Sequence, residues 1–207
     1  ADDPGGLAVS MKLQHAITIT GATKNNVDNA LSYTDTADSA LEAVAEILDR
    51  MSTLRTSYGG ATATESDKAS YAAEFKELSK SLAGYKSETF NGISLFATTG
   101  NQVSMKVYTS TRGDSGVYIS ISQVDIDGAL SVNGSTASST VNLESSTGSL
   151  SISSVTIGSM TSAIDKVATL RATTGATASR LGFASDFLST NKTNLEAANS
   201  RIMDVDV

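Results

Sequence analysis

This chain of 207 residues contains no cysteine, no tryptophan, one histidine and one proline. The absence of cysteine excludes a disulfide scaffold, a thiolate metal site and a cysteine nucleophile. The single histidine, His15, excludes zinc sites that need two histidines, such as the HExxH arrangement. No apolar run approaches the roughly 18 residues of a membrane-spanning helix, so the sequence predicts no membrane segment.

Aromatic residues are scarce, at 5%, although 40% of the residues are hydrophobic and the chain is long enough to bury a core. A core poor in bulky side chains favours helices or strands that pack closely together, and hence an elongated domain rather than a globular one. The net charge is −7 and the basic residues are scattered. Because nucleic-acid binding needs clustered Lys and Arg, no nucleic-acid partner is expected.

A first long helix is predicted from about Gly5 to about Tyr58, where two glycines follow. A weaker apolar pattern runs through Leu7, Leu13 and Ile17. Downstream, apolar or small residues recur at steps of three and four, as in a helix packed lengthwise on others. These residues are Val27, Ala30, Thr34, Ala37, Leu41, Val44, Leu48 and Met51, with Leu31, Ile47 and Leu54 widening the stripe.

Two further helices are predicted. The second begins with a capping sequence at residues 64–67, carries an apolar face from Tyr71 to Tyr85, and stops near Lys86. The third covers residues 160–205 with strict alternation of three and four, and at about 1.5 Å per residue it would extend for roughly 70 Å. Polar residues on its seam favour register specificity over strength. They are Thr174, Thr177 and Asn191.

Residues 93–158 differ in character and predict strands in hairpins, for example at residues 117–121 and 150–152. Residues 125–128 (DIDG) fit a hairpin turn better than a calcium loop, because the later ligand positions are apolar. The expected fold is mainly α with a small β part, an elongated antiparallel bundle of two N-terminal helices and one long C-terminal helix beside a β-hairpin region. The expected divisions are residues 1–96, 97–158 and 159–207.

The sequence contains few residues in arrangements that are typical of catalytic sites. The chain shows no glycine-rich phosphate loop, no Ser/His/Asp set and no acid pair in a recognisable pocket context, so neither an enzyme nor a metal or other cofactor is expected. Asp2 and Asp3 precede the only proline, Pro4, and fit a helix cap better than a metal pair.

Several segments resemble bacterial flagellin, in the family's own order. Residues 1–13 (ADDPGGLAVSMKL) resemble ADDPAGLAIS, and residues 36–41 (TADSAL) resemble TAEGAL. Residues 47–51 (ILDRM) are similar to ILQRM, and residues 89–92 (TFNG) match the TxFNG turn with a one-residue gap before Phe90. Residues 170–176 (LRATTGA) resemble QRAxLGA, and residues 194–206 (NLEAANSRIMDVD) resemble NLxAAxSRIRDxD.

The resemblance implies a structural subunit of the bacterial flagellar filament that self-assembles into a helical tube for motility. It implies an extracellular location, export by the flagellar type III apparatus, a homopolymer formed through the full-length chain, and an export chaperone and a cap as partners of the parent. It further implies a trimmed subunit that lacks two inner-tube segments. Asp2, Asp3 and Pro4, with Asp204 and Asp206, would then form the joint toward those segments.

The family is also sensed by a Toll-like receptor through a surface on the first and second helices. Arg50 and Leu54 match that surface, Glu74 fits it, and Asp49 replaces its glutamine. Because an acid cannot donate as an amide does, the resemblance implies weak recognition at most.

Two alternatives remain at this stage. One is the hook-filament junction protein, an adaptor with flagellin-like ends. The other is an adhesin or glycan-binding module displayed on a filament, with the Ser/Thr/Gly-rich stretch 131–148 as its tip.

Overall fold

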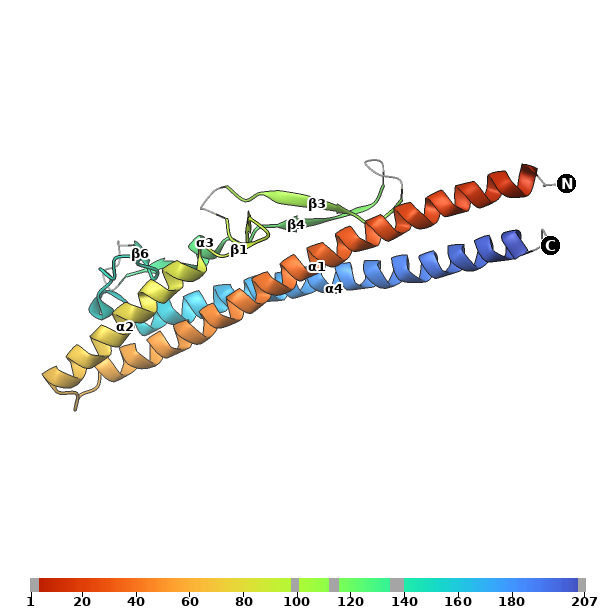
Figure 1. The fold of residues 1–207 in the computed structure, drawn as a ribbon. Helices are drawn as coiled ribbons and strands as arrows, with labels where there is room; N and C mark the ends of the chain where they lie inside the picture. The colour runs from red at the N-terminus through yellow and green to blue at the C-terminus, as the bar shows by residue number, and fades with distance from the viewer. Residues whose placement is uncertain (1–3, 98–100, 112–115, 135–139, 205–207) are drawn as a thin grey trace. The chain divides into compact units, whose positions relative to one another are not determined.

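The computed structural model describes residues 4–97, 101–111, 116–134 and 140–204 (Figure 1). It is mainly helical with small antiparallel hairpins, as predicted. In chain order the elements are α1 (Pro4–Tyr58), α2 (Glu65–Tyr85), β1 (Thr89–Phe90), β2 (Ile93–Ser94), β3 (Ser104–Tyr108), β4 (Tyr118–Ser122), α3 (Ile126–Leu130), β5 (Ser131–Asn133), β6 (Thr140–Asn142), the 3₁₀ turn η2 (Ile152–Ser154) and α4 (Ile157–Asp204).

Helix α1 buries the stripe that its sequence predicts. Val27, Leu41, Val44, Leu48 and Met51 are fully buried. The weaker upstream pattern holds only in part, because Ile17 is buried whereas Leu7 is exposed. The other buried side chains there carry hydroxyl groups. They are Ser10, Thr20 and Thr23.

Many hydroxyl groups on the long helices bond to the helix that carries them. Thr20 and Thr34 donate to the carbonyls of Ala16 and Ala30, at 2.7 and 2.8 Å. The exposed residues Ser39, Thr53 and Thr56 do the same four residues back. These bonds satisfy the hydroxyls without a tertiary partner.

Helix α2 starts with the cap that its sequence predicts. The Thr64 hydroxyl accepts from the Asp67 amide at 3.2 Å, and the Asp67 carboxylate accepts from the Thr64 amide at 3.0 Å. This reciprocal capping box satisfies two backbone donors that the helix cannot bond internally. The helix then buries Phe75, Ser79 and Leu82.

Helix α4 begins three residues before the predicted start, because Thr156 and Ser159 form a second reciprocal cap. Met160, Ala163, Val167, Leu181 and Leu188 are buried, and Thr174 on the predicted seam is also buried. Beyond Leu188 the seam is only half-buried, including Asn191, and Val205 lies outside the described residues.

The three two-stranded sheets are β1–β2, β3–β4 and β5–β6. In β1–β2, Phe90 lies opposite Ile93, and the loop between them is Asn91-Gly92. Both loop residues have positive φ, 50° and 78°. This is the geometry of a type I′ turn, which suits the twist of the strands it joins, and it accounts for the Thr-Phe-Asn-Gly sequence there.

Two expectations for the region between α2 and α4 are wrong. Residues 125–128 are not a hairpin turn: Asp125 caps the short helix α3 by accepting from the Gly128 amide at 3.0 Å. An Asp followed three residues later by Gly suits either structure, and the buried Ile126 and Leu130 favour the helix. Residues 150–152 are not a strand, because Ile152 starts the turn η2.

The chain divides into two compact units. Unit 1 comprises residues 1–34, 104–121 and 176–207, and unit 2 comprises residues 35–103 and 122–175. In unit 1 the start of α1 and the end of α4 run side by side and antiparallel, and the first turn of α1 and the last turn of α4 lie at the same end of this unit (Figure 1). Ser10 bonds to Asn199 there, while Asp28 bonds to Ser185.

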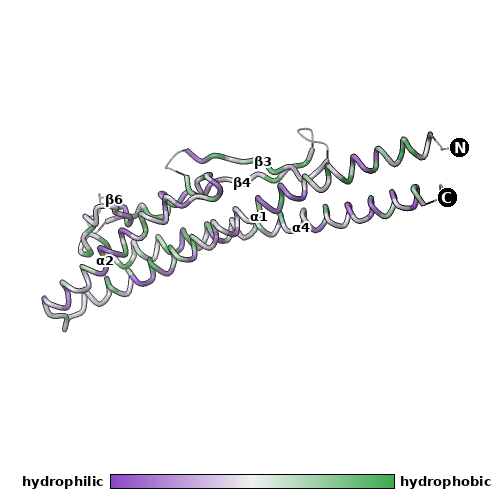
Figure 2. Tube along the Cα trace, viewed as in Figure 1, coloured by the Kyte–Doolittle hydropathy of each residue, from purple (hydrophilic) through white to green (hydrophobic). Residues whose placement is uncertain are grey.

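Unit 2 holds the larger apolar core, built from α1, α2, α3, α4 and the hairpin segments, with Leu41, Phe75, Leu95, Leu130 and Met160 all essentially buried. Hydrophilic and hydrophobic residues alternate along every long helix (Figure 2). Consistent with this, no described helix has an apolar stretch long enough to cross a membrane.

Candidate functional site

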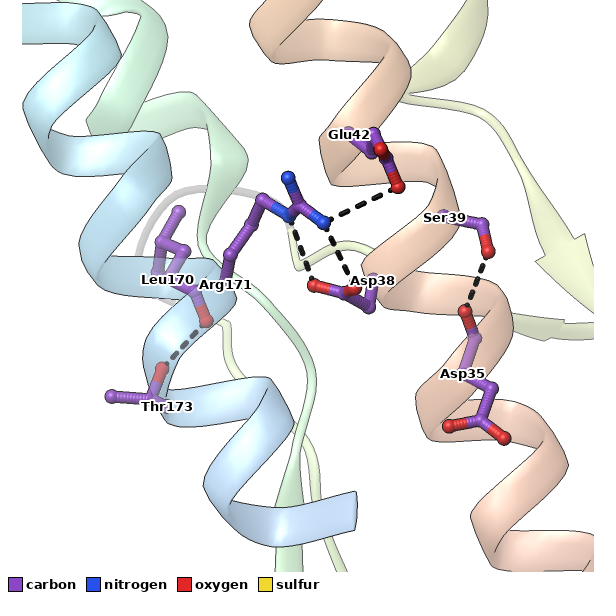
Figure 3. Close-up of polar contacts among 7 residues, drawn as sticks. All are labelled: Asp35, Asp38, Ser39, Glu42, Leu170, Arg171 and Thr173. Carbon is purple, nitrogen blue, oxygen red and sulfur yellow. Dashed lines mark hydrogen bonds and ion pairs between the residues drawn. The ribbon is translucent and has the colours of Figure 1, made fainter. Parts of the chain in front are cut away.

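An arginine on α4 connects that helix to α1 in unit 2. Arg171 donates from Nε and Nη2 to the two carboxylate oxygens of Asp38, at 3.1 and 3.2 Å, and from Nη2 to Glu42 at 3.3 Å (Figure 3). The hydrogen bond to Asp38 raises the pKa of the Arg171 guanidinium, so the group stays charged. The two-pronged geometry matches the guanidinium fork, which a lysine could not reproduce.

A second arginine connects α1 to α2. Arg50 donates from Nε and Nη2 to the Glu74 carboxylate at 2.6 and 2.9 Å. Hydrogen bonding to Arg50 lowers the pKa of Glu74, and the same contact raises the pKa of Arg50. Both side chains remain about half exposed, at 53% and 42%, so water and salt screen the pair.

The four residues matched to the receptor surface do not form one exposed patch. Asp49, Arg50 and Glu74 are exposed or half exposed, but Leu54 is only 2% exposed and belongs to the core of unit 2. Arg50 and Glu74 already bond to each other. A partner at this surface would meet a neutralised ion pair and the Asp49 carboxylate, without an apolar contact from Leu54.

The predicted joint lies where α1 begins and α4 ends. Pro4 is the first residue of α1 and Asp204 the last of α4, whereas Asp2, Asp3 and Asp206 lie outside the described residues. Ser10 donates to Asn199 at 2.9 Å and contacts the Met203 sulfur at 3.3 Å. The helix start and the helix end are thus neighbours.

Sequence reasoning missed a lysine that joins α2 to the hairpin segments of unit 2. Lys86 contacts Asp127 of α3 at 2.7 Å and Glu144 at 3.3 Å, and the bond to Asp127 raises the pKa of Lys86. These three residues line a shallow pocket with Ser131 and Asn142. Their charges pair with one another, so the pocket offers no free base or nucleophile.

Other polar contacts in unit 2 also had no signal in the sequence. Lys166 of α4 donates to the carbonyls of Gly128 and Ser131 at 2.9 and 3.0 Å. The buried Ser79 of α2 donates to the carbonyl of Leu143 at 2.7 Å. Such side-chain bonds to backbone carbonyls of distant segments have no spacing rule, whereas Arg171, Asp38 and Arg50 all lie in segments with a recognisable motif.

Comparison with known proteins places these features in a family. The family description "Bacterial flagellin N-terminal helical region" matches residues 1–101, and "Bacterial flagellin C-terminal helical region" matches residues 157–207. The chain belongs to the bacterial flagellin family. It is therefore a structural component of the bacterial flagellum, a subunit of the filament, and not an enzyme. The Arg50–Glu74 pair and the Arg171–Asp38 pair both lie within these matched regions.

Two curated flagellins match this chain over its whole length. A flagellin of Halalkalibacterium halodurans is 28% identical over 207 residues, which is all of this chain and 72% of the relative. A flagellin of Bacillus subtilis is 27% identical, and the match covers all of this chain and 75% of that protein.

Solved structures share the fold. The crystal structure of Bacillus cereus flagellin is 25% identical with a TM-score of 0.61, over 84% of this chain and 94% of that one. A putative flagellar hook-associated protein from Vibrio parahaemolyticus has a TM-score of 0.77 over 97% of this chain and 98% of that one, but only 14% identity. That likeness concerns the fold alone, so the hook-filament adaptor is not favoured. The glycan-binding alternative for residues 131–148 stays a hypothesis, and residues 135–139 of that stretch lie outside the described residues.

Proposed function

We propose that this flagellin builds the filament by heterologous contacts, in which one face of each copy binds a different face of the next. Such contacts propagate as a helical tube, whereas contacts between identical faces close as a dimer. The observation that supports this most is the antiparallel pairing of α1 and α4 within each unit. Polar bonds at Ser10–Asn199 and Asp38–Arg171 hold the pairs, and this leaves outer helix faces available to neighbouring copies.

Filament formation is tested by expressing the whole gene that encodes this chain in flagellated cells that lack their own flagellin. We expect long filaments by electron microscopy and restored swimming. Arg171→Ala should shorten the filaments, while Arg201→Ala on the same helix, which breaks no ion pair among the described residues, controls for loss of charge. Secreted, folded protein that forms no filaments would contradict the proposal.

The same assay addresses the route by which the subunit reaches the filament. The family relationship supports an extracellular location, export through the flagellar type III apparatus, an export chaperone and a filament cap. Deleting the export gate or the cap gene should remove filaments, and the protein should accumulate in the cells or in the medium respectively. Normal filaments in the strain without the export gate would contradict export by the type III apparatus, and normal filaments in the strain without the cap would contradict the need for a cap.

We further propose that Toll-like receptor recognition is weak. The support is the burial of Leu54, the internal Arg50–Glu74 pair and the carboxylate at Asp49. Receptor-reporter cells should respond poorly to the protein, and equally poorly to Glu74→Ala. A strong response that this substitution removes would show that the surface is active.

The joint between this domain and flanking segments is a related proposal. It assigns residues 2–4 together with 204 and 206 to the two places where the chain enters and leaves the domain. The adjacency of Ser10 and Met203 supports it. Limited proteolysis of the parent protein should cut first near both places, and first cuts inside α1 or α4 would contradict it.

A further inference from the structure

Helix α4 exposes two phenylalanines on one face of unit 1. Phe183 is 74% exposed and Phe187 is 66% exposed, whereas Phe75 and Phe96 are buried. The two exposed rings are four residues apart, so they lie on the same side of the helix. Arg180 lies one turn before Phe183 on this side and is also exposed. We call Arg180, Phe183 and Phe187 the Phe surface.

The Phe surface has no ion-pair partner in the part of the chain that the structure describes. Arg180 forms none, and the nearest acid in sequence, the exposed Asp186, lies six positions further on and about 120° around the helix from Arg180 at 100° per residue. Two adjacent exposed aromatic rings in a chain with so few aromatics mark a surface that a partner covers.

An acidic stripe lies on α1 within unit 2. Asp35, Glu42, Glu46 and Asp49 are all exposed and occur at steps of seven, four and three, which keeps them on one face. Glu42 shares Arg171 with Asp38, while no ion pair among the described residues involves Asp35, Glu46 or Asp49. Between Asp35 and Glu42, the Ser39 hydroxyl bonds to its own helix (Figure 3).

The two units also differ in charge. The described side chains of unit 1 include six basic and three acidic groups, whereas unit 2 contains eight basic and fourteen acidic groups. Opposite potentials orient and hold partners. The surface of unit 1 carries Arg180, and the acidic stripe of unit 2 carries Asp35, Glu46 and Asp49, none of which forms an ion pair within the described ranges. The two surfaces are therefore complementary in charge.

We infer that the Phe surface of one copy packs on the acidic stripe of a second copy, with Arg180 facing the carboxylates and the two rings over the small residues between them. The inference rests on the proposed heterologous assembly and names its contact. Two Phe surfaces packed on each other would juxtapose two arginines and would close as a dimer. Packing on the acidic stripe brings Arg180 to carboxylates instead of to a second arginine, and it does not close as a dimer. Each copy at the end of the chain of subunits then keeps either a Phe surface or an acidic stripe for the next copy.

The test replaces Phe187 with the photo-crosslinking analogue p-benzoylphenylalanine in filaments assembled by cells. Irradiation should give intermolecular products in which residue 187 is joined to residues 35–49 of another copy, identified by mass spectrometry. The analogue at Thr193, exposed on another side of α4, is the matched control and should not label that segment. Labelling of another segment from position 187, or labelling within one copy alone, would overturn the inference.

If the analogue at position 187 blocks filament assembly, reversing the charge of residue 180 provides a second test of the same contact. Arg180→Glu should weaken subunit association about tenfold, and adding Glu46→Lys should restore most of it. Circular dichroism should show an unchanged fold, because Arg180 forms no ion pair with any residue that the structure describes. Filaments of R180E as stable as the wild type would overturn the inference. Wild-type protein that forms no filaments would instead overturn the proposed function.

Discussion

Arg50 on α1 and Glu74 on α2 join two helices through a pair of parallel hydrogen bonds, 2.6 and 2.9 Å long. The residues are 24 positions apart in sequence, and the turn that begins at Gly59 lies between them. The pair therefore orients α2 on α1 at the surface of unit 2, and Met51 of α1 and Phe75 of α2 are buried in the same unit.

Exchanging the two charges should show how much this contact contributes. Arg50→Glu and Glu74→Arg should each lower the urea concentration at the unfolding midpoint, because each brings like charges together. The double variant R50E/E74R should recover most of the loss. In 1 M salt the single variants should approach the wild type. Additive losses in the double variant would show that the pair does not couple the helices.

Two phenylalanines offer a matched comparison of burial. Phe75→Ala should lower the free energy of unfolding by about 3–5 kcal/mol, because its ring is fully buried and leaves a cavity. Phe187→Ala should cost less than about 0.5 kcal/mol in the monomer, because that ring is 66% exposed. Urea denaturation followed by circular dichroism measures both. Equal losses would contradict the assignment of Phe187 to a free surface.

Two glycines should respond to alanine in opposite directions. Gly92 has a φ of 78°, so Gly92→Ala should destabilise the protein by about 1 kcal/mol. Gly175 lies inside α4, and a Cβ there would meet no atom within 4 Å. Gly175→Ala should therefore stabilise by about 0.5–1 kcal/mol through helix propensity. Thermal unfolding should show a lower midpoint temperature for Gly92→Ala and a higher one for Gly175→Ala than for the wild type. Midpoints that shift in the same direction in both variants would contradict this prediction.

Asp28 should make stability depend on acidity. Lys24 donates to it at 2.6 Å, as does Ser185, and these bonds hold its pKa below the ordinary value of 3.8. A lowered carboxyl pKa stabilises the fold above pH 3.8, and this stabilisation is lost as the pH falls through the depressed value.

Asp28→Asn should therefore lose stability at neutral pH, by less than about 1 kcal/mol because the pair is partly exposed, and should flatten the dependence of unfolding free energy on pH below 3.8. Asp186→Asn, an exposed acid on α4, is the control and should behave as the wild type. An unchanged pH profile in D28N would contradict the assignment.

The long helices could be predicted from the sequence because their signals are repeated many times. Steps of three and four over dozens of residues located α1 and α4 to within three residues of their ends, and the Thr64 cap located α2. Short elements carry only one signal. Asp125 with Gly128 fits a turn as well as a helix cap, and the alternation at residues 150–152 was too short to separate a strand from a 3₁₀ turn.

The candidate site shows a conflict between two kinds of pattern. Leu54 fits a recognition motif, but it also falls three residues after Met51 on the apolar stripe, and the structure buries it. The spacing of apolar residues depends directly on which side chains are buried, whereas a motif shows only similarity to other sequences. For Leu54, the spacing therefore predicted the burial correctly and the motif did not. The contacts of Lys86 and Lys166 could not be predicted, since they depend on which backbone carbonyls and acidic side chains, distant in sequence, the fold brings close to these lysines.

The hydroxyl groups that bond to their own helices affect how such a surface behaves toward a neighbour. The hydroxyl groups of Ser39, Thr53 and Thr56 already donate to backbone carbonyls of their own helix. They therefore need no acceptor from a molecule that packs on them. Two faces of this kind can shift along each other without breaking a hydrogen bond between them. The positions at which they come to rest are then determined by the sparse charges and rings that project from them.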